Sequence, residues 1–306
     1  MTHPDPTPLE SKRAAIAFIL LASLLVAGTT LLAKALGTDT LGEPLHPLQI
    51  SHGRFLFAWV TVVCAVALLR PKFTSPHWRL HTARSAFGYS GITLLFAAVA
   101  FIPIADATAI SFLNPVFAMI LAIPLLGERV GKIRWLAAAI ALTGALILLR
   151  PGSSAFQPAA LLAFAAAIVM GVEITIIKLL TGREAPLQIL FINNSIGVII
   201  ATSIVVFVWS MPTAAQWTAL AGLGMMMAAA QTCFIQAMRR AESSFVAPFS
   251  YATLIFASFY DAVLFGTLPD SVSLIGAAII VAGAALLAYR EARAANQALV
   301  TPPKRP

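Results

Sequence analysis

Long apolar stretches follow one another along this chain of 306 residues, and they restrict it to a membrane. A helix needs about 20 mainly apolar residues to cross the hydrocarbon core of a bilayer. Ten such stretches can be placed, and short connections join them. They cover residues 14–36, 48–69, 83–102, 106–126, 133–150, 158–180, 188–208, 216–237, 244–265 and 271–290. We therefore predict an all-α integral membrane protein with ten transmembrane helices.

The small number of charges supports this prediction. Hydrophobic residues make up 59% of the chain and charged residues 10%, whereas a soluble domain carries about 25% charged residues. The first apolar stretch is longer than the roughly 7–15 residues of a signal-peptide core, so we expect it to remain as a helix. Residues 1–13 and 291–306 are polar, and we expect a disordered cytoplasmic N-terminus and a cytoplasmic tail.

The lysines and arginines predict the orientation of the chain. If ten helices cross the bilayer, 17 of the 20 basic residues fall at one face, and the opposite connections hold only Arg150. Lys34 and Arg54 lie within spans. Cytoplasmic loops are rich in basic residues, so both termini are predicted to be cytoplasmic, in the inner membrane of a bacterium. The net charge of +8 does not indicate nucleic-acid binding, because the basic residues are scattered between apolar segments.

The chain contains an internal repeat. A single 139-residue shift places Pro47-Leu48-Gln49-Ile50 on Pro186-Leu187-Gln188-Ile189, Trp78 on Trp217, and Gly144 on Gly283. The two copies cover residues 14–150 and 151–290, each with five predicted helices. Because five is odd, the second copy enters the membrane from the opposite side. Inverted repeats of this kind are common in secondary transporters that work by alternating access.

Several motifs carry a resemblance to a known family. The first half contains Asn114-Pro115-Val116-Phe117 and Leu125-Leu126-Gly127-Glu128-Arg129, and the second contains Ala247-Pro248-Phe249-Ser250-Tyr251 and Leu264-Phe265-Gly266. With these motifs the chain resembles the drug/metabolite transporter superfamily, in its ten-helix EamA-type branch. Two departures are Thr267, where the family has an acidic residue, and Leu254, at the position that matches Pro115.

The resemblance implies a carrier with a central cavity, lined by helices 1–4 and 6–9. Members of the family move amino acids, nucleotide-like compounds, vitamins such as riboflavin, and drugs. Some members export and others import, so the family does not select one substrate or direction.

Ionisable groups within spans are costly, and each is a candidate for function. The 139-residue shift places Lys34 on Glu173, and the two carry opposite charges. They are predicted to bind the two ends of a zwitterion, or to pair when the site is empty. The alternatives are that Lys34 extends to the membrane interface and that Glu173 pairs with Lys178. Glu173 is also a candidate carrier of a coupling proton.

The other candidates are polar or aromatic. Arg54 falls on Asn193 under the same shift, and its planar guanidinium suits a carboxylate or phosphate, although it could instead anchor to lipid headgroups. Asn193 and Gln231 offer amides for hydrogen bonds to a substrate. Tyr89 and Tyr251 lie on helix faces that could stack a flat substrate, with plain core packing as the alternative. Asp261 is interpreted as reaching water from near its helix end.

No sequence motif indicates an enzyme. The chain has no P-loop, HExxH, CxxC or GxSxG motif, and its five histidines form no metal-ligand pattern, so we expect no catalysis, cofactor or metal. The predicted function is secondary transport of a small organic metabolite, such as an amino acid or riboflavin. The expected partners are that substrate, the lipid bilayer and a coupling proton, in a monomer or homodimer. A lipid-modifying membrane enzyme and a non-transporting scaffold are the alternatives.

Overall fold

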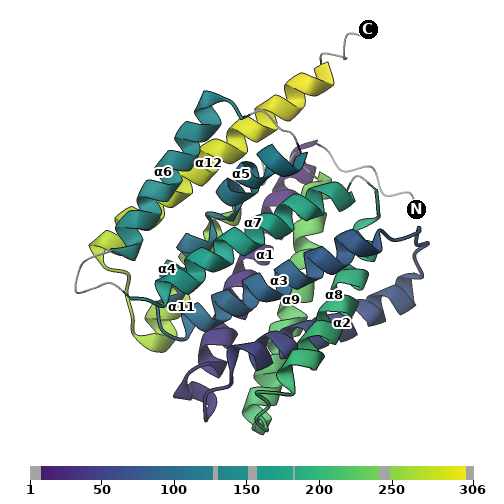
Figure 1. The fold of residues 1–306 in the computed structure, drawn as a ribbon, viewed down its shortest axis with the longest axis vertical. Coiled ribbons are helices and arrows are strands. Elements are labelled where there is room, and N and C mark those ends of the chain that lie inside the picture. The colour runs from purple at the N-terminus through teal and green to yellow at the C-terminus, as the bar shows by residue number, and fades with distance from the viewer. Residues whose placement is uncertain (1–7, 127–129, 151–156, 182, 241–248, 301–306) are drawn as a thin grey trace.

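The computed structural model describes residues 8–126, 130–150, 157–181, 183–240 and 249–300. The motif residues at 127–129 and 247–248 lie outside the described residues. The described chain is helical, with no strand assigned in it, and Figure 1 shows its helices as one bundle. The helices are α1 (Pro8–Leu36), the 3-10 turn η1 (Asp39–Leu41), α2 (Pro47–Leu69), α3 (Trp78–Val99), α4 (Ile104–Ser111), α5 (Asn114–Leu126), α6 (Lys132–Leu149), α7 (Ala160–Thr181), α8 (Pro186–Val205), α9 (Ala214–Arg240), α11 (Ala252–Phe265) and α12 (Ser271–Val300).

Seven helical stretches of the described chain are long and apolar enough to cross a membrane. They are Arg13–Leu36, Pro47–Leu69, Ile104–Pro124, Lys132–Leu149, Ala160–Ile177, Pro186–Val205 and Ala214–Ala237. The remaining predicted spans fall on α3, which carries Arg79, His81 and Arg84 in its first turns, and on the shorter apolar stretches Ala252–Phe265 and Ser271–Leu287. The chain is thus a multi-pass membrane protein, and the count of ten spans stays a prediction.

The predicted fourth span, 106–126, is two helices and not one. Helix α4 ends at Ser111, and α5 begins at Asn114 after a break at Phe112 and Leu113. The cause is Pro115, which has no backbone N–H, and whose ring would clash with the carbonyl of Ser111 in a continuous helix. The break thus interrupts the helix within a single apolar segment, Ile104–Pro124.

Helices α2 and α8 run antiparallel and are joined at both ends by a glutamine. Gln49, in the first turn of α2, accepts a hydrogen bond from the backbone N–H of Ser210 (3.1 Å) and donates to the Ser210 carbonyl (2.6 Å) beyond the end of α8. Gln188, in the first turn of α8, accepts from the backbone N–H of Thr74 (2.8 Å) and donates to the Thr74 carbonyl (2.9 Å) beyond the end of α2. Each glutamine therefore fixes the connection that follows the other helix.

Helices α6 and α12 lie side by side along one edge of the bundle (Figure 1). A Cβ atom on Gly144 would lie 2.7 Å from the carbonyl oxygen of Gly276, and one on Gly283 would lie 2.5 Å from the backbone nitrogen of Ala141. The two backbones therefore approach as closely as glycine allows. Gly144 and Gly283 are positions that the 139-residue shift superposes.

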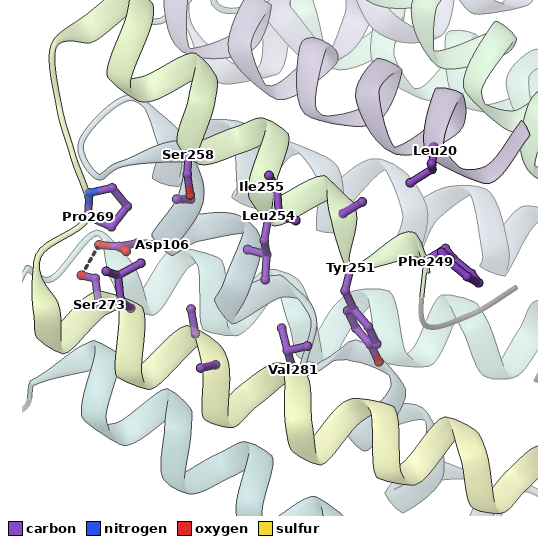
Figure 2. A pocket seen from close by; sticks show the side chains of 15 residues that line it. Leu20, Asp106, Phe249, Tyr251, Leu254, Ile255, Ser258, Pro269, Ser273 and Val281 are labelled. Carbon is purple, nitrogen blue, oxygen red and sulfur yellow. Dashed lines mark hydrogen bonds between the residues drawn. The ribbon is translucent and has the colours of Figure 1, made fainter. Parts of the chain in front are cut away.

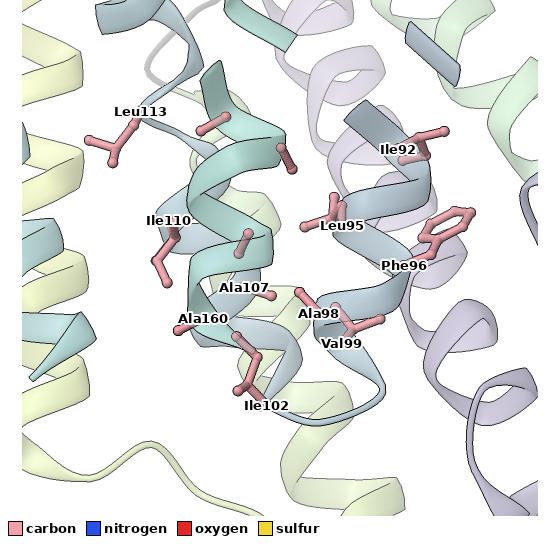
Figure 3. Close-up of a cluster of buried hydrophobic side chains, with 14 of the residues drawn as sticks. Ile92, Leu95, Phe96, Ala98, Val99, Ile102, Ala107, Ile110, Leu113 and Ala160 are labelled. Carbon is pink, nitrogen blue, oxygen red and sulfur yellow. The ribbon is translucent and has the colours of Figure 1, made fainter. Parts of the chain in front are cut away.

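A buried apolar cluster holds α3, α4 and α7 together (Figure 3). Phe96 and Val99 of α3, Ile110 of α4 and Ala160 of α7 are fully or almost fully buried in it. The main contacts of α7 are with α3, just as those of α1 are with α9. The pairing of α3 with α7 positions the charged side chains described next.

Candidate functional site

A cavity of about 570 Å³ lies among helices α1, α3, α7, α8, α9 and the start of α11. Its walls are mostly apolar, with Phe112, Met227 and Phe234 among the larger side chains. Its polar side chains are Ser23, Arg84, Gln231, Ser250 and Thr253. The first turn of α8 and the second half of α9 both line it, so the cavity lies toward the end of the bundle that holds the α7–α8 connection.

Arg84 links the cavity wall to Glu173. The Arg84 side chain is 6% exposed, and its Nε atom lies 3.7 Å from Oε1 of Glu173 in α7. Its Nη1 donates a hydrogen bond to the carbonyl of Ile189 (3.2 Å). Glu173 reaches α3 because Gly88 has no side chain: a Cβ atom there would lie 2.9 Å from the carboxylate. A glycine one turn after an arginine thus makes room for the arginine's counter-ion.

Arg54 of α2 is a second buried cation in this region. Its guanidinium carbon lies 4.7 Å from the ring centre of Phe55, and the residue is 9% exposed. It interacts electrostatically with both Glu173 and Arg84. Its Nε atom is buried and finds no hydrogen-bond partner among the described residues. Anchoring to lipid headgroups, the alternative considered for Arg54, does not fit a residue that is 9% exposed, and its predicted role in binding an anionic substrate group stays a prediction.

Lys34 pairs with Asp261 and not with Glu173. Its Nζ lies 2.8 Å from Oδ1 of Asp261 in α11, and 4.4 Å from the ring centre of Phe265. The other carboxylate oxygen of Asp261 accepts a hydrogen bond from the backbone N–H of Ala105 (3.0 Å), at the start of α4. Asp261 is 0% exposed, so the expectation that it reaches water is wrong. This pair ties α1, α4 and α11 together.

Three other predicted site residues lie in different places. Gln231 lines the cavity, and its Oε1 atom is buried without a hydrogen-bond partner in the described chain. Asn193 is buried and accepts a hydrogen bond from the Ser85 hydroxyl (3.2 Å). Tyr89 is 3% exposed, and its ring packs 5.8 Å from that of Phe55. Asn193 and Tyr89 are therefore held by protein contacts.

Tyr251 faces a second hollow, a mostly apolar groove between α11 and α12 (Figure 2). Leu254, Ile255 and Val281 lie along the same groove. The ring of Tyr251 packs edge-to-face against Phe112 at 5.2 Å, and Phe112 lines the cavity described above. This aromatic contact therefore joins the linings of the groove and the cavity.

Polar contacts outside the apolar segments stabilise the connections. Glu184, between α7 and α8, accepts hydrogen bonds from the backbone and ring of His77 (2.9 and 3.0 Å) and from His81 (2.9 Å). Burial alone would raise the pKa of Glu184, but these hydrogen bonds lower it to about 2. Before α12, Asp270 binds Arg150 and the backbone N–H of Ser273, and these bonds lower its pKa to about 2.

Sequence reasoning misses Arg84 and Asp261 as buried charges. With the third span predicted to begin at 83, Arg84 falls among the basic residues at the membrane edge, whereas α3 begins at Trp78. Gly88, one turn later on the same helix face, could have indicated part of this arrangement, because a glycine there leaves room for a side chain that approaches Arg84. For Asp261 no such signal exists, since its partner Lys34 is 227 residues away.

The described residues contain no group of three or more His, Cys, Asp or Glu side chains that would hold a metal ion. A bundle of apolar helices around a cavity of small-molecule size, with buried charges at its wall, is typical of a membrane protein that handles small solutes. The model of the EamA-like transporter family matches residues 13–150 and 157–289. The chain therefore belongs to the EamA-like transporter family.

Relatives of known function are similar over most of their length. The S-adenosylmethionine uptake transporter of Rickettsia bellii is 25% identical over 292 residues, which cover 94% of this chain and 98% of that protein. The riboflavin transporter of Rhizobium johnstonii is 32% identical over 222 residues, covering 71% and 72% of the two chains. A crystal structure with 22% identity superposes with a TM-score of 0.59 over 90% of this chain and 97% of that one, which shows a shared fold.

Proposed function

We propose that this protein is a secondary transporter, which moves a small organic metabolite across the bacterial inner membrane by alternating access. It is built from two five-helix repeats, residues 14–150 and 151–290, inverted with respect to each other, with both termini in the cytoplasm. The observation that carries the proposal is the cavity of about 570 Å³ within a bundle whose contacts follow the 139-residue shift. Family membership supports transport in preference to catalysis.

Contacts between the proposed repeats favour an inverted arrangement. Gln49 and Gln188 make the same hydrogen bonds at opposite ends of the α2–α8 pair. In the α6–α12 pair, Gly144 lies against Gly276, and Gly283 lies against Ala137, which is the counterpart of Gly276. Reciprocal contacts of this kind are what a two-fold axis between two copies produces.

The cavity suits a substrate of the size of a vitamin or an amino acid with an aromatic side chain. Ligand cavities for small molecules span roughly 300–1,000 Å³, with mostly apolar walls and a few polar groups that fix orientation. Arg84 and Gln231 are the polar groups placed for that role, and they lie on α3 and α9. Riboflavin, S-adenosylmethionine and indole-3-propionate, an anion of about the size of tryptophan, are therefore the first compounds to test.

Transport is tested with purified protein in liposomes. We expect counterflow of at least one of the three labelled compounds, above that of protein-free liposomes. Met227→Trp places a bulky ring in the cavity and should reduce transport at least about tenfold, because a filled cavity excludes the substrate. Ile255→Trp is the matched control, since Ile255 is 70% exposed at the bundle surface, and it should transport normally. Equal transport by the two variants would contradict the placement of the route in this cavity.

A further inference from the structure

The charge cluster behind the cavity wall carries more positive than negative charge. Arg54, Arg84 and Glu173 interact electrostatically with one another, and all three lie inside the helix bundle. Two arginines against one glutamate leave a net charge of at least +1, whether Glu173 is ionised or protonated. The Lys34–Asp261 pair, by contrast, has one cation and one anion in direct contact at 2.8 Å.

Hydrogen bonding is also incomplete in this charge cluster. The Nε atoms of Arg54 and Arg84 are buried, and neither finds a hydrogen-bond partner among the described residues. Arg84 and Glu173 are 3.7 Å apart, which exceeds a hydrogen bond. A buried charge without a counter-ion is strongly unfavourable, so natural proteins seldom leave one unless a ligand supplies the partner.

Arg84 is the member of the cluster that a ligand in the cavity reaches. It lines the cavity, whereas Arg54 and Glu173 are absent from its wall. The same wall holds Gln231, whose buried Oε1 atom can only accept a hydrogen bond and has no donor in the described chain. The missing partners are thus an anion near Arg84 and an N–H or O–H group near Gln231.

We propose that the cavity binds a substrate of net charge −1, whose carboxylate is held by Arg84 and whose N–H or O–H group donates to Gln231. Arg54 contributes the second positive charge and so acts as a positioning residue. The rest of the substrate is mainly apolar, because the remaining wall of the cavity is apolar apart from Ser23, Ser250 and Thr253. A carboxylate is preferred to a phosphate dianion, because the cluster with ionised Glu173 balances one negative charge and not two. This inference specifies the substrate class of the transport site proposed above and rests on that function.

The unbalanced charge is tested first in the empty protein. Arg54→Met removes a buried cation with no counter-ion of its own, and we expect the melting temperature in detergent to rise by about 2–4 °C. Lys34→Met is the matched control, because it removes a buried cation that does have a counter-ion, and it should lower the melting temperature. A fall in melting temperature for Arg54→Met would overturn the proposal.

Charge preference is tested with three indoles of similar size. Indole-3-propionate is an anion, tryptophan a zwitterion and tryptamine a cation, and each is titrated against purified protein while the melting temperature is followed. We expect the anion to bind at least about tenfold more tightly than the cation, and Arg54→Met to remove that preference without weakening tryptamine binding. Tighter binding of tryptamine would overturn the proposal. If none of the indoles binds, the melting temperatures of Arg54→Met and Lys34→Met without ligand decide whether the proposal stands.

The two proposals fail separately. Stabilisation by indole-3-propionate without counterflow of any compound would contradict transport and leave the anion site standing. Counterflow of a neutral or cationic compound, with the same rate in Arg54→Met as in the wild type, would contradict the anion site and leave transport standing.

Discussion

The first half of the chain places Lys34 where the second half places Glu173, and the surroundings of the two residues differ. Lys34 lies 2.8 Å from Asp261, whose second oxygen binds the start of α4. Glu173 lies 3.7 Å from Arg84, beside a second arginine that no anion of the described chain contacts directly. Gln49 and Gln188, which the same shift superposes, make matching hydrogen bonds.

This difference distinguishes the contacts that hold the helices together from the charges that lie near the cavity. Where positions that the repeat superposes make matching contacts, as the glutamines and glycines do, they join helices. Where such positions carry different charges, Lys34 is fully paired, whereas Glu173 is incompletely paired with Arg84, which lines the cavity. Symmetric contacts therefore mark the framework, and the asymmetric charges mark the region in which binding is expected.

The largest effect is expected at the paired charge. Lys34→Met leaves Asp261 buried without a counter-ion and should destabilise the protein by about 3–5 kcal/mol, measured by denaturant unfolding in detergent. Lys34→Met combined with Asp261→Asn should recover most of that loss, since the amide oxygen of asparagine still accepts from Ala105. Equal losses in the single and double variants would show that Lys34 acts through packing and not through charge.

The glycines of the α6–α12 pair should show equal effects of the next size. Gly144→Ala and Gly283→Ala each place a Cβ atom within 2.7 Å of a neighbouring backbone, and each should cost about 1–3 kcal/mol in unfolding free energy. Gly222→Ala, inside α9, is the control, because a Cβ atom there meets only a Leu32 side-chain atom at an ordinary contact distance of 3.5 Å, and it should not destabilise the protein. A large difference between the first two variants would argue against matched packing of the halves.

The glutamines should show effects of similar size to those of the glycines, but unequal ones. Gln49→Ala and Gln188→Ala leave backbone groups without partners, at a cost of about 1–3 kcal/mol each by the same measurement. Gln188→Ala should cost more, because Gln188 also donates to Glu184 (2.7 Å), whereas Gln49 has no such acidic partner in the described chain. A larger cost for Gln49→Ala would indicate that the Glu184 contact contributes little.

Acid should weaken the α7–α8 connection and so lower the melting temperature. This effect should be smallest near neutral pH. Because the pKa of Glu184 is lowered to about 2 on folding, its ionised form stabilises the native state above the ordinary pKa of about 4.3. That stability is lost as the pH falls from about 4.3 toward 2. The melting temperature between pH 6 and pH 3 should fall less steeply in Glu184→Gln than in the wild type, and an unchanged slope would contradict the assignment. Asp39→Asn, in the exposed η1 turn, serves as the control.

Local patterns in the sequence predict much of the helix framework. Apolar length and the prolines at 47 and 186 place α2 and α8 to within a few residues, because a proline suits the first position of a helix. The break before Pro115 is not predicted, although proline chemistry explains it. Buried Arg84 and the Lys34–Asp261 pair are missed because tertiary contacts between distant residues decide them, and no local pattern encodes such contacts.

Helix α3 is the exception among the long helices in the order in which its charges find partners during synthesis. It is not among the stretches that are apolar enough to cross a membrane, and Arg84 lies in its first turns. The counter-ion of Arg84 lies in α7, which leaves the ribosome only after α4, α5 and α6. Until α7 emerges, Arg84 lacks this counter-ion. We therefore expect the α3–α7 contact to form only after more than half of the chain has been synthesised.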